Sequence, residues 1–249
     1  MRKIAKLLAI VLAVSMLLCG CGGETDEYME EDAIVEEEAA EEEAAVEAEE
    51  EEPAEEELPQ DRNLTLGQVT ENVYTNEYMD VYFAPNGWTM QGAGELQDAL
   101  AGVGEVMEGT ELEGKLEGLT QVMDMQGVAP DGISNVNVVY TKIGAMERLA
   151  YMALDEEQVL DAILENMDSM IEAYSNAGIS VASMTKVPVN YRGEERMAVR
   201  TLGTVQGVNI CILQVYECKL GSYSAAITVT CLDEAEAIEI MGMFEKLNP

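Results

Sequence analysis

None of the 249 residues of the chain is a histidine, which excludes the catalytic and metal-binding sites that need this side chain. Without it there is no Ser-His-Asp triad, no Cys-His pair and no histidine-ligated metal. Tryptophan and phenylalanine are scarce, with one and two residues, whereas methionine occurs 16 times. Lysine and arginine total 13 against 49 acidic residues, which gives a formal net charge of −36. We therefore expect no nucleic acid as a partner, because binding its phosphates requires positive charge.

The charge divides the chain into three zones. Residues 1–20 contain the early positive charges Arg2, Lys3 and Lys6. Residues 24–61 contain 21 acidic residues and no basic one, and residues 62–249 contain 28 acidic and 10 basic residues, a net charge of −18. We predict a signal peptide over 1–20, a lipidated cysteine with a disordered acidic linker over 21–62, and a single globular domain over 63–249.

The first zone has the pattern of an export signal. A basic start precedes an apolar run from Ile4 to Leu18, which is shorter than the roughly 20 residues of a membrane span. The run ends in Leu17-Leu18-Cys19-Gly20-Cys21, which resembles the lipobox of bacterial lipoproteins. The resemblance implies a diacylglycerol on Cys21 and a place on the extracytoplasmic face of the bacterial cell membrane. A secretory signal cleaved elsewhere and an uncleaved anchor are the alternatives.

The second zone is nearly all glutamate and alanine between Glu36 and Glu57. Like charges without a compensating lysine or arginine oppose a helix, and low hydrophobicity favours disorder. We predict a spacer that carries the domain away from the membrane. Binding of cations or of a basic partner by the linker itself is the alternative.

The third zone has the patterns of an α+β domain. Strands are expected over 81–83, 121–128, 135–143, 179–189, 195–205, 208–218 and 222–231. Helices are expected over 95–107, 112–119, 155–178 and 233–247. The last four strands follow each other closely, with a two-residue turn at Gln206-Gly207, and indicate a meander. We therefore predict a mainly antiparallel sheet of about six or seven strands covered by helices.

Several segments of this domain also carry a family resemblance. They are Tyr74-Thr-Asn-Glu-Tyr78, Phe83-Ala-Pro-Asn-Gly-Trp88 and Asn135-Val-Asn-Val-Val-Tyr140, followed by the capped helix and the meander. Together they resemble a group of uncharacterised bacterial surface lipoproteins whose domain order is similar to the PsbP-like α/β/α sandwich. The resemblance implies a non-catalytic domain that binds, stabilises or helps assemble other proteins. It assigns no site residue.

Three cysteines lie on the last two strands of the meander. If Cys218 pairs near Ser224 across the intervening turn, Cys211 falls opposite Cys231, and a disulfide between them is one interpretation. The favoured alternative is three buried thiols, because directly opposed strand cysteines often have poor disulfide geometry. No zinc-type cysteine spacing and no dinucleotide motif occurs, so we expect neither a metal nor a cofactor.

Arg192, Arg196 and Arg200 are the densest basic group of the domain. They are a candidate binding stripe on one strand, and charge relief for an acidic domain is the alternative. The methionines on the apolar stripes are expected in the core, although a methionine-lined groove between a helix and the sheet is a second interpretation.

These patterns predict a membrane-anchored extracytoplasmic lipoprotein with a non-catalytic binding or assembly role. Its expected partners are the membrane, through the Cys21 lipid, and either another envelope protein or an extracellular ligand. We do not expect an enzyme, since acidic groups such as Asp155-Glu156-Glu157 are better explained as helix starts. A carboxylate-dependent extracellular hydrolase is the alternative, and a purely structural role with the acidic linker as the working part is a third hypothesis.

Overall fold

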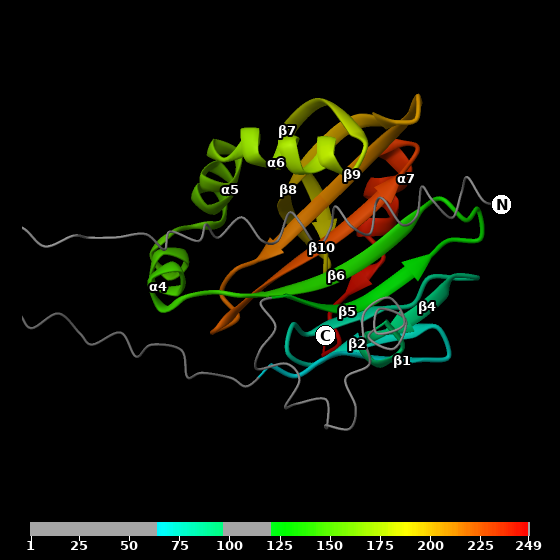
Figure 1. Ribbon diagram of the computed structural model, residues 1–249. Coiled ribbons are helices and arrows are strands. Elements are labelled where there is room, and N and C mark those ends of the chain that lie inside the picture. The colour runs from blue at the N-terminus through cyan, green and yellow to red at the C-terminus, as the bar shows by residue number, and fades with distance from the viewer. Residues whose placement is uncertain (1–63, 97–120, 249) are drawn as a thin grey trace, which may run out of the picture.

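The computed structural model describes residues 64–96 and 121–248, which form two antiparallel sheets (Figure 1). The larger sheet has the order β4 (Thr89–Gly92), β5 (Gln121–Val128), β6 (Asn135–Lys142), β10 (Tyr223–Cys231), β9 (Val208–Glu217), β8 (Glu194–Val205) and β7 (Ile179–Tyr191). The smaller has the order β1 (Gln68–Thr70), β2 (Val73–Asn76), β3 (Val81–Phe83) and β11 (Phe244–Glu245). The predicted α+β class with a mainly antiparallel sheet is confirmed, whereas the smaller sheet was not predicted.

The predicted four-strand meander is present as β7 to β10. Val205 pairs with Val208 across the turn between β8 and β9. The two turn residues, Gln206 and Gly207, have φ angles of 52° and 81°. Two positive φ angles are the mark of a type I′ turn, whose twist matches that of the strands it connects. The predicted hairpin at Gln206-Gly207 is therefore confirmed.

The helices whose two ends both lie in the described part are α4 (Ala145–Ala153), α5 (Glu156–Glu165), α6 (Met167–Asn176) and α7 (Glu234–Met241), and residues 93–96 are helical as well. Asp155 and Gln158 form the expected capping box at the start of α5. The helix predicted over 155–178 is divided, because Asn166 has a ψ of 18° and its side-chain Nδ2 donates to the carbonyl of Ala162. None of these helices is long and apolar enough to cross a membrane.

Other sequence predictions fall outside the described residues. They are the signal peptide, the linker, and the helices over 95–107 and 112–119 beyond Leu96. The helix α4 was not predicted.

The C-terminal helix ends earlier than expected. It stops at Met241, and Phe244 enters β11, where it pairs with Phe83 of β3. The two rings are stacked, with centroids 4.3 Å apart. Phe244 is completely buried between Phe83 and Tyr191, and this burial favours the strand over a longer helix. The sequence pattern around Phe244 does not indicate this outcome.

The seven-stranded sheet separates two cores. On one face, α5 and α6 cover β7 and β8, and Leu160, Met170 and Tyr174 are buried there (Figure 1). The other face is covered by α7 and the four-stranded sheet, and its cluster contains Trp88 and Met125. The predicted core role is thus confirmed for these methionines, and Trp88 is buried with them. The second core also positions the candidate site, since Trp88 and α7 both belong to it.

Candidate functional site

A depression lies where α7 meets the β5–β6 turn and the start of β4. Its lining residues come from three segments that are far apart in the sequence: Trp88; Ala129, Pro130 and Asp131; and Glu236, Glu239, Ile240 and Met243. Its volume is about 260 Å³. This is smaller than the roughly 300–1,000 Å³ of typical small-molecule pockets, and it suits one or two side chains of a partner. We call it the α7 depression.

One face of α7 and the turn after it supply half of this lining. Glu236, Glu239 and Ile240 follow each other at the i, i+3, i+4 spacing that places residues on one side of a helix, and Met243 lies two residues beyond the end of the helix at Met241. Asp233 is the N-cap of this helix, and its carboxylate accepts hydrogen bonds from the backbone N–H groups of Ala235 and Glu236. The cap sets where the helix starts and therefore which face meets the β5–β6 turn.

Trp88 contributes the aromatic part of the lining. Its ring meets Phe83 edge-on, with centroids 6.0 Å apart, and its exposed fraction is 7%. Gly127 leaves room for it, since a Cβ there would lie 3.3 Å from Cε3 of Trp88 and 2.6 Å from Sδ of Met90. Because Trp88 is the one tryptophan in the chain, its fluorescence reports directly on this depression.

Three carboxylates border the depression, and two of them share one hydroxyl. The Ser134 Oγ lies 2.8 Å from Asp131 Oδ2 and 3.0 Å from Glu236 Oε1. One hydroxyl proton cannot satisfy both acceptors at once, so the rim keeps spare acceptor capacity. Within the described part of the chain, Glu239 forms no hydrogen bond or ion pair, which adds to this capacity.

Asp131 stays ionised because of the turn that holds it. Partial burial raises its pKa, but the N–H groups of Ile133 and Ser134, each at 2.9 Å from Oδ1, and the Ser134 hydroxyl outweigh this effect. The pKa of Asp131 therefore lies below its ordinary value of 3.8. The rim carries negative charge at neutral pH as a result.

An apolar lining with a negative rim matches side chains that have both an aliphatic stem and a cationic end. Arginine and lysine have this form, and a cation is attracted to an indole face as well as to carboxylates. The described residues contain no group of three or more His, Cys, Asp or Glu side chains placed to hold a metal ion. The carboxyl with a strongly raised pKa, Asp124, is fully buried and does not line the depression.

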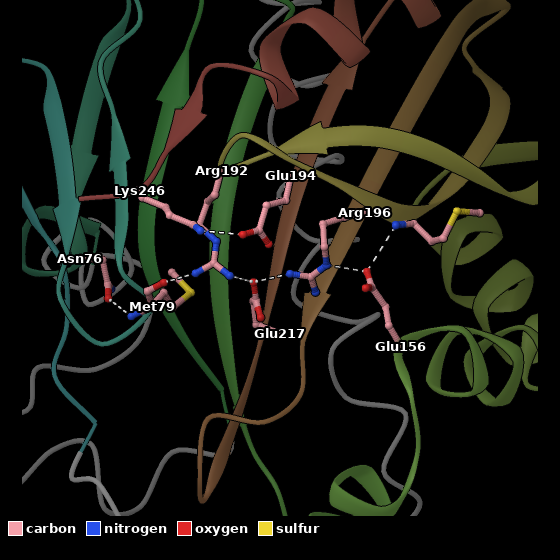
Figure 2. A network of polar contacts seen from close by, with 9 residues as sticks. Asn76, Met79, Glu156, Arg192, Glu194, Arg196, Glu217 and Lys246 are labelled. Carbon is pink, nitrogen blue, oxygen red and sulfur yellow. Dashed lines mark hydrogen bonds and ion pairs between the residues drawn. The ribbon is translucent and has the colours of Figure 1, made fainter. Parts of the chain in front are cut away.

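Two arginines of the predicted binding stripe converge on one carboxylate (Figure 2). Nη2 of Arg192 lies 3.0 Å and Nη1 of Arg196 lies 3.3 Å from Oε1 of Glu217. Nε of Arg196 also donates to Glu156 on α5 at 2.7 Å. Both guanidinium groups lie near the Tyr191 ring, 5.1 and 6.0 Å from its centroid. Carboxylates and an aromatic ring of this same chain therefore engage both arginines.

The same cluster fastens the β7–β8 turn to neighbouring segments. Arg192 donates from its side chain to the carbonyl of Met79, and its backbone N–H donates to the carbonyl of Phe244 at 2.9 Å. Beside it, Lys246 of the C-terminal segment donates to Glu194 at 2.6 Å. These contacts link the turn to the loop after β2 and to β11 (Figure 2). This geometry agrees with the charge-relief interpretation.

Arg200, the third arginine of the predicted stripe, lies apart from the other two. Its Nη1 is 2.6 Å from Glu234 at the start of α7, and its Nη2 donates to Thr185 at 3.0 Å. The structure thus brings together Arg192 and Arg196 but not Arg200.

Cys211 and Cys231 are directly opposed across β9 and β10, as the predicted register requires. Both are buried, as the favoured interpretation requires, whereas Cys218 is only partly buried, and none of the three forms a disulfide within the described part of the chain. Burial raises the pKa of Cys211 to about 11 and that of Cys231 to about 12. Thiols in this state are protonated at neutral pH and are poor nucleophiles.

Sequence reasoning missed the α7 depression. The signal for the depression in the sequence was Glu239, a carboxylate one turn after Glu236 and next to the apolar Ile240. Nothing in the sequence showed that the β5–β6 turn would face these residues.

The comparisons with known proteins find similarity in structure and none in sequence. No protein-family model matches the chain, and no curated protein matches it. The chain is similar to the solution structure of cyanobacterial PsbP, CyanoP, from Synechocystis sp. PCC 6803. The identity is 11%, the match covers 74% of this chain and 94% of that one, and the TM-score is 0.40. No function or site residue is carried over from this likeness.

Proposed function

We propose that the chain is a lipid-anchored extracytoplasmic protein whose domain binds a basic, partly apolar segment of another envelope protein in the α7 depression. The observation that carries this proposal is the depression itself. It combines the Trp88 and Met243 side chains with the carboxylate of Glu239, which has no partner among the described residues. Such a combination of apolar lining and a few convergent polar groups is typical of binding sites.

An arginine or lysine side chain of the partner fits this lining. Its methylene groups would pack against Trp88 and Met243, and its cation would reach Glu239 and the under-satisfied Glu236. Arginine has an advantage over lysine, since its planar guanidinium can donate two parallel hydrogen bonds to a carboxylate. We therefore expect arginine beside apolar residues in the bound segment.

The charge of the whole domain favours the same class of partner. Residues 62–249 contain 28 acidic and 10 basic residues, a net charge of −18. A field of this sign attracts basic segments and raises their association rate at low ionic strength. Arg192, Arg196 and Arg200 do not oppose this attraction locally, because each is paired with a glutamate of the same chain.

The anchor and the linker give the domain its working place in this proposal. The Leu17–Cys21 segment supports lipidation at Cys21, and the acidic linker repels itself and an anionic membrane alike. Roughly 40 linker residues at about 3.5 Å each can reach on the order of 130 Å. The domain would therefore search a wide zone outside the membrane for its partner.

A fluorescence titration tests the proposed binding. Full-length protein is titrated with a short peptide that alternates arginine and leucine, and Trp88 emission is followed. We expect a saturable change that weakens with salt, and an affinity lower by about fivefold in Glu239→Gln, because one charge-assisted contact is lost. Glu172→Gln, on the exposed side of α6, is the matched control and should bind like the wild type.

Two results would contradict this proposal. One is the lack of any saturable emission change with the basic peptide. The other is equal binding of a peptide in which glutamate replaces arginine, since contact with an acidic rim requires the cation. The anchor has its own test, in which Cys21→Ser should move the protein from the membrane fraction to the soluble fraction, and unchanged membrane association would refute lipidation at Cys21.

A further inference from the structure

Asp124 is a fully buried carboxylate in the middle of the apolar strand β5. Its position is an extra residue in the ladder, since Met123 pairs with Val139 and Met125 pairs with Val138. A bulge of this kind turns one side chain away from the regular alternation. The carboxylate of Asp124 has an exposed fraction of 0% and takes no part in the α7 depression.

The hydrogen-bond donors to Asp124 come from the start of the domain. The backbone N–H of Gly67 donates at 2.8 Å to Oδ1 and lies 3.1 Å from Oδ2. The hydroxyl of Tyr74 donates at 2.6 Å and Nδ2 of Asn76 at 2.8 Å, both to Oδ2. One carboxylate of the seven-stranded sheet thus holds three points between Gly67 and Asn76, the segment that contains β1 and β2.

Gly67 has to be a glycine for this contact to form. A Cβ at this position would lie 2.3 Å from Cε2 of Tyr74 and 2.9 Å from the carbonyl oxygen of Thr75. Contacts this short cannot be accommodated without moving the chain, and one of the two obstacles is backbone. The missing side chain lets the Gly67 N–H approach the carboxylate closely.

Among the described residues, the groups that face Asp124 include no cation. Tyr74 on β2 and Tyr140 on β6 are its titratable neighbours, and Asn76 lies between them, with Nδ2 3.0 Å from the Tyr74 hydroxyl and 2.9 Å from the Tyr140 hydroxyl. Burial raises the pKa of both tyrosines far above its ordinary value, so both remain neutral. Asp124 is therefore the group of this cluster whose charge changes at moderate pH.

We propose that Asp124 is a protonation-controlled latch that fixes the segment Gly67–Asn76 to the seven-stranded sheet and holds it more tightly in acid. When the segment is docked, Asp124 is removed from water, and when it detaches, water reaches the carboxylate. Docking therefore favours the neutral form of Asp124 over the charged form. By linkage, a state that binds the proton more strongly is stabilised when the pH falls.

The pKa of Asp124 agrees with this geometry. Burial raises the pKa to about 6 from the ordinary value of 3.8, against the opposing hydrogen bonds from Tyr74, Gly67 and Asn76. The added stability is fully present below the ordinary value and is lost as the pH rises through about 6. The docking equilibrium should therefore change about tenfold between roughly pH 7.5 and pH 5.

This latch lies where the linker joins the domain. The first described residue is Leu64, three positions before Gly67. In a lipid-anchored protein, any pull on the linker reaches the Gly67–Asp124 contact directly after the packing of Leu64 and Leu66 on the core, so acid outside the membrane would strengthen the attachment. That consequence depends on the anchorage proposed above, whereas the latch itself depends on neither the anchor nor the depression.

Hydrogen exchange of the full-length chain tests the latch. Exchange of the backbone amides in 67–76 is measured near pH 5 and near pH 7.5, with the intrinsic rate of each amide divided out. We expect about tenfold greater protection at the lower pH, with little change in β8 and β9. Asp124→Asn, which cannot ionise, should lose this pH dependence, and Asp131→Asn, an exposed control, should keep it.

A second variant distinguishes a latch controlled by protonation of Asp124 from a simple loss of structure in the Asp124→Asn variant. Tyr74→Phe removes a hydrogen bond that lowers the pKa of Asp124, so the step in protection should move to higher pH. Equal protection of 67–76 at both pH values in the wild type would overturn the proposal. So would an unchanged pH dependence in Asp124→Asn, or a step in Tyr74→Phe that stays in place or moves to lower pH.

Discussion

In the α7 depression the carboxylates of Glu236 and Glu239 have one hydrogen-bond donor between them among the described residues, whereas in the Asp124 cluster three donors surround one carboxylate. Glu236 and Asp131 share the hydroxyl of Ser134, and Glu239 has no partner among the described residues. Asp124 receives hydrogen bonds from Gly67, Tyr74 and Asn76 and has no contact with solvent. Two properties therefore distinguish the carboxylates that can receive a ligand from those that hold the fold together. They are the number of hydrogen-bond donors to each carboxylate and its access to water.

The largest expected effect comes from disrupting the Asp124 cluster at its glycine. Gly67→Ala places a Cβ against the Tyr74 ring and the Thr75 carbonyl and separates the Gly67 N–H from the carboxylate. We expect the free energy of unfolding to fall by about 4 kcal/mol, measured by urea denaturation. Gly94→Ala is the control, since no atom lies within 4 Å of its added Cβ. Equal stability of the two variants would show that the close approach at Gly67 is unimportant.

The second largest effect is the pH dependence of the free energy of unfolding that the titration of Asp124 produces. The carboxyl carbon of Asp124, followed by NMR, should titrate at about 6, and Tyr74→Phe should raise this pKa further. A carboxyl that titrates at about 6 when folded and at 3.8 when exposed makes unfolding about 3 kcal/mol more costly at low pH than at neutral pH. Titration of Asp124 near 3.8 would show that water reaches the cluster and would remove this difference.

A smaller effect of pH on stability, opposite in sign to that of Asp124, is expected from Asp131 at the rim of the α7 depression. Asp131 has a lowered pKa, so its contribution to stability is present above 3.8 and is lost as the pH falls through the lower, folded value. Because the side chain is exposed, Asp131→Asn should cost less than about 1 kcal/mol at neutral pH. Denaturation curves over a pH series should show this cost vanishing in acid. A cost that grows in acid would contradict the contrast between the two regions.

The smallest effect is expected on peptide affinity, in a variant that changes the apolar lining of the α7 depression and leaves its acidic rim intact. Met243→Gln keeps the length of the side chain and removes much of its apolar character, so the arginine-leucine peptide should bind about threefold more weakly with the same salt dependence. Leu149→Gln on α4, also an exposed apolar residue, is the matched control. Trp88 fluorescence measures both variants. Equal affinities would mean that binding involves the carboxylates alone.

The features that sequence reasoning predicted correctly depend on neighbours in the chain. The turn at Gln206-Gly207 needs two positive φ angles, and the cap at Asp155 needs a partner three residues later. The meander follows from short turns between alternating segments, so its register placed Cys211 opposite Cys231. Each of these signals lies within a few residues, where propensity and pattern act directly.

The features that were missed depend on residues far apart in the sequence. β11 exists because Phe244 packs on Phe83, 161 positions earlier in the chain. Asp124 stands in an apolar strand, and only the fold places Gly67 and Tyr74 above it. A bulge and a two-residue strand have no periodicity of their own, and the α7 depression draws on three distant segments.

Cross-linking from the α7 depression in intact producing cells tests the binding proposal most directly. A photo-reactive amino acid is placed at Met243, and in a control at Leu149, and the captured peptides are identified by mass spectrometry. We predict that the Met243 position captures one envelope protein through a segment with arginine beside apolar residues, and that the double variant Glu236→Gln, Glu239→Gln abolishes this capture. Capture that is equal from both positions, or that persists in the double variant, would contradict a partner site in the α7 depression.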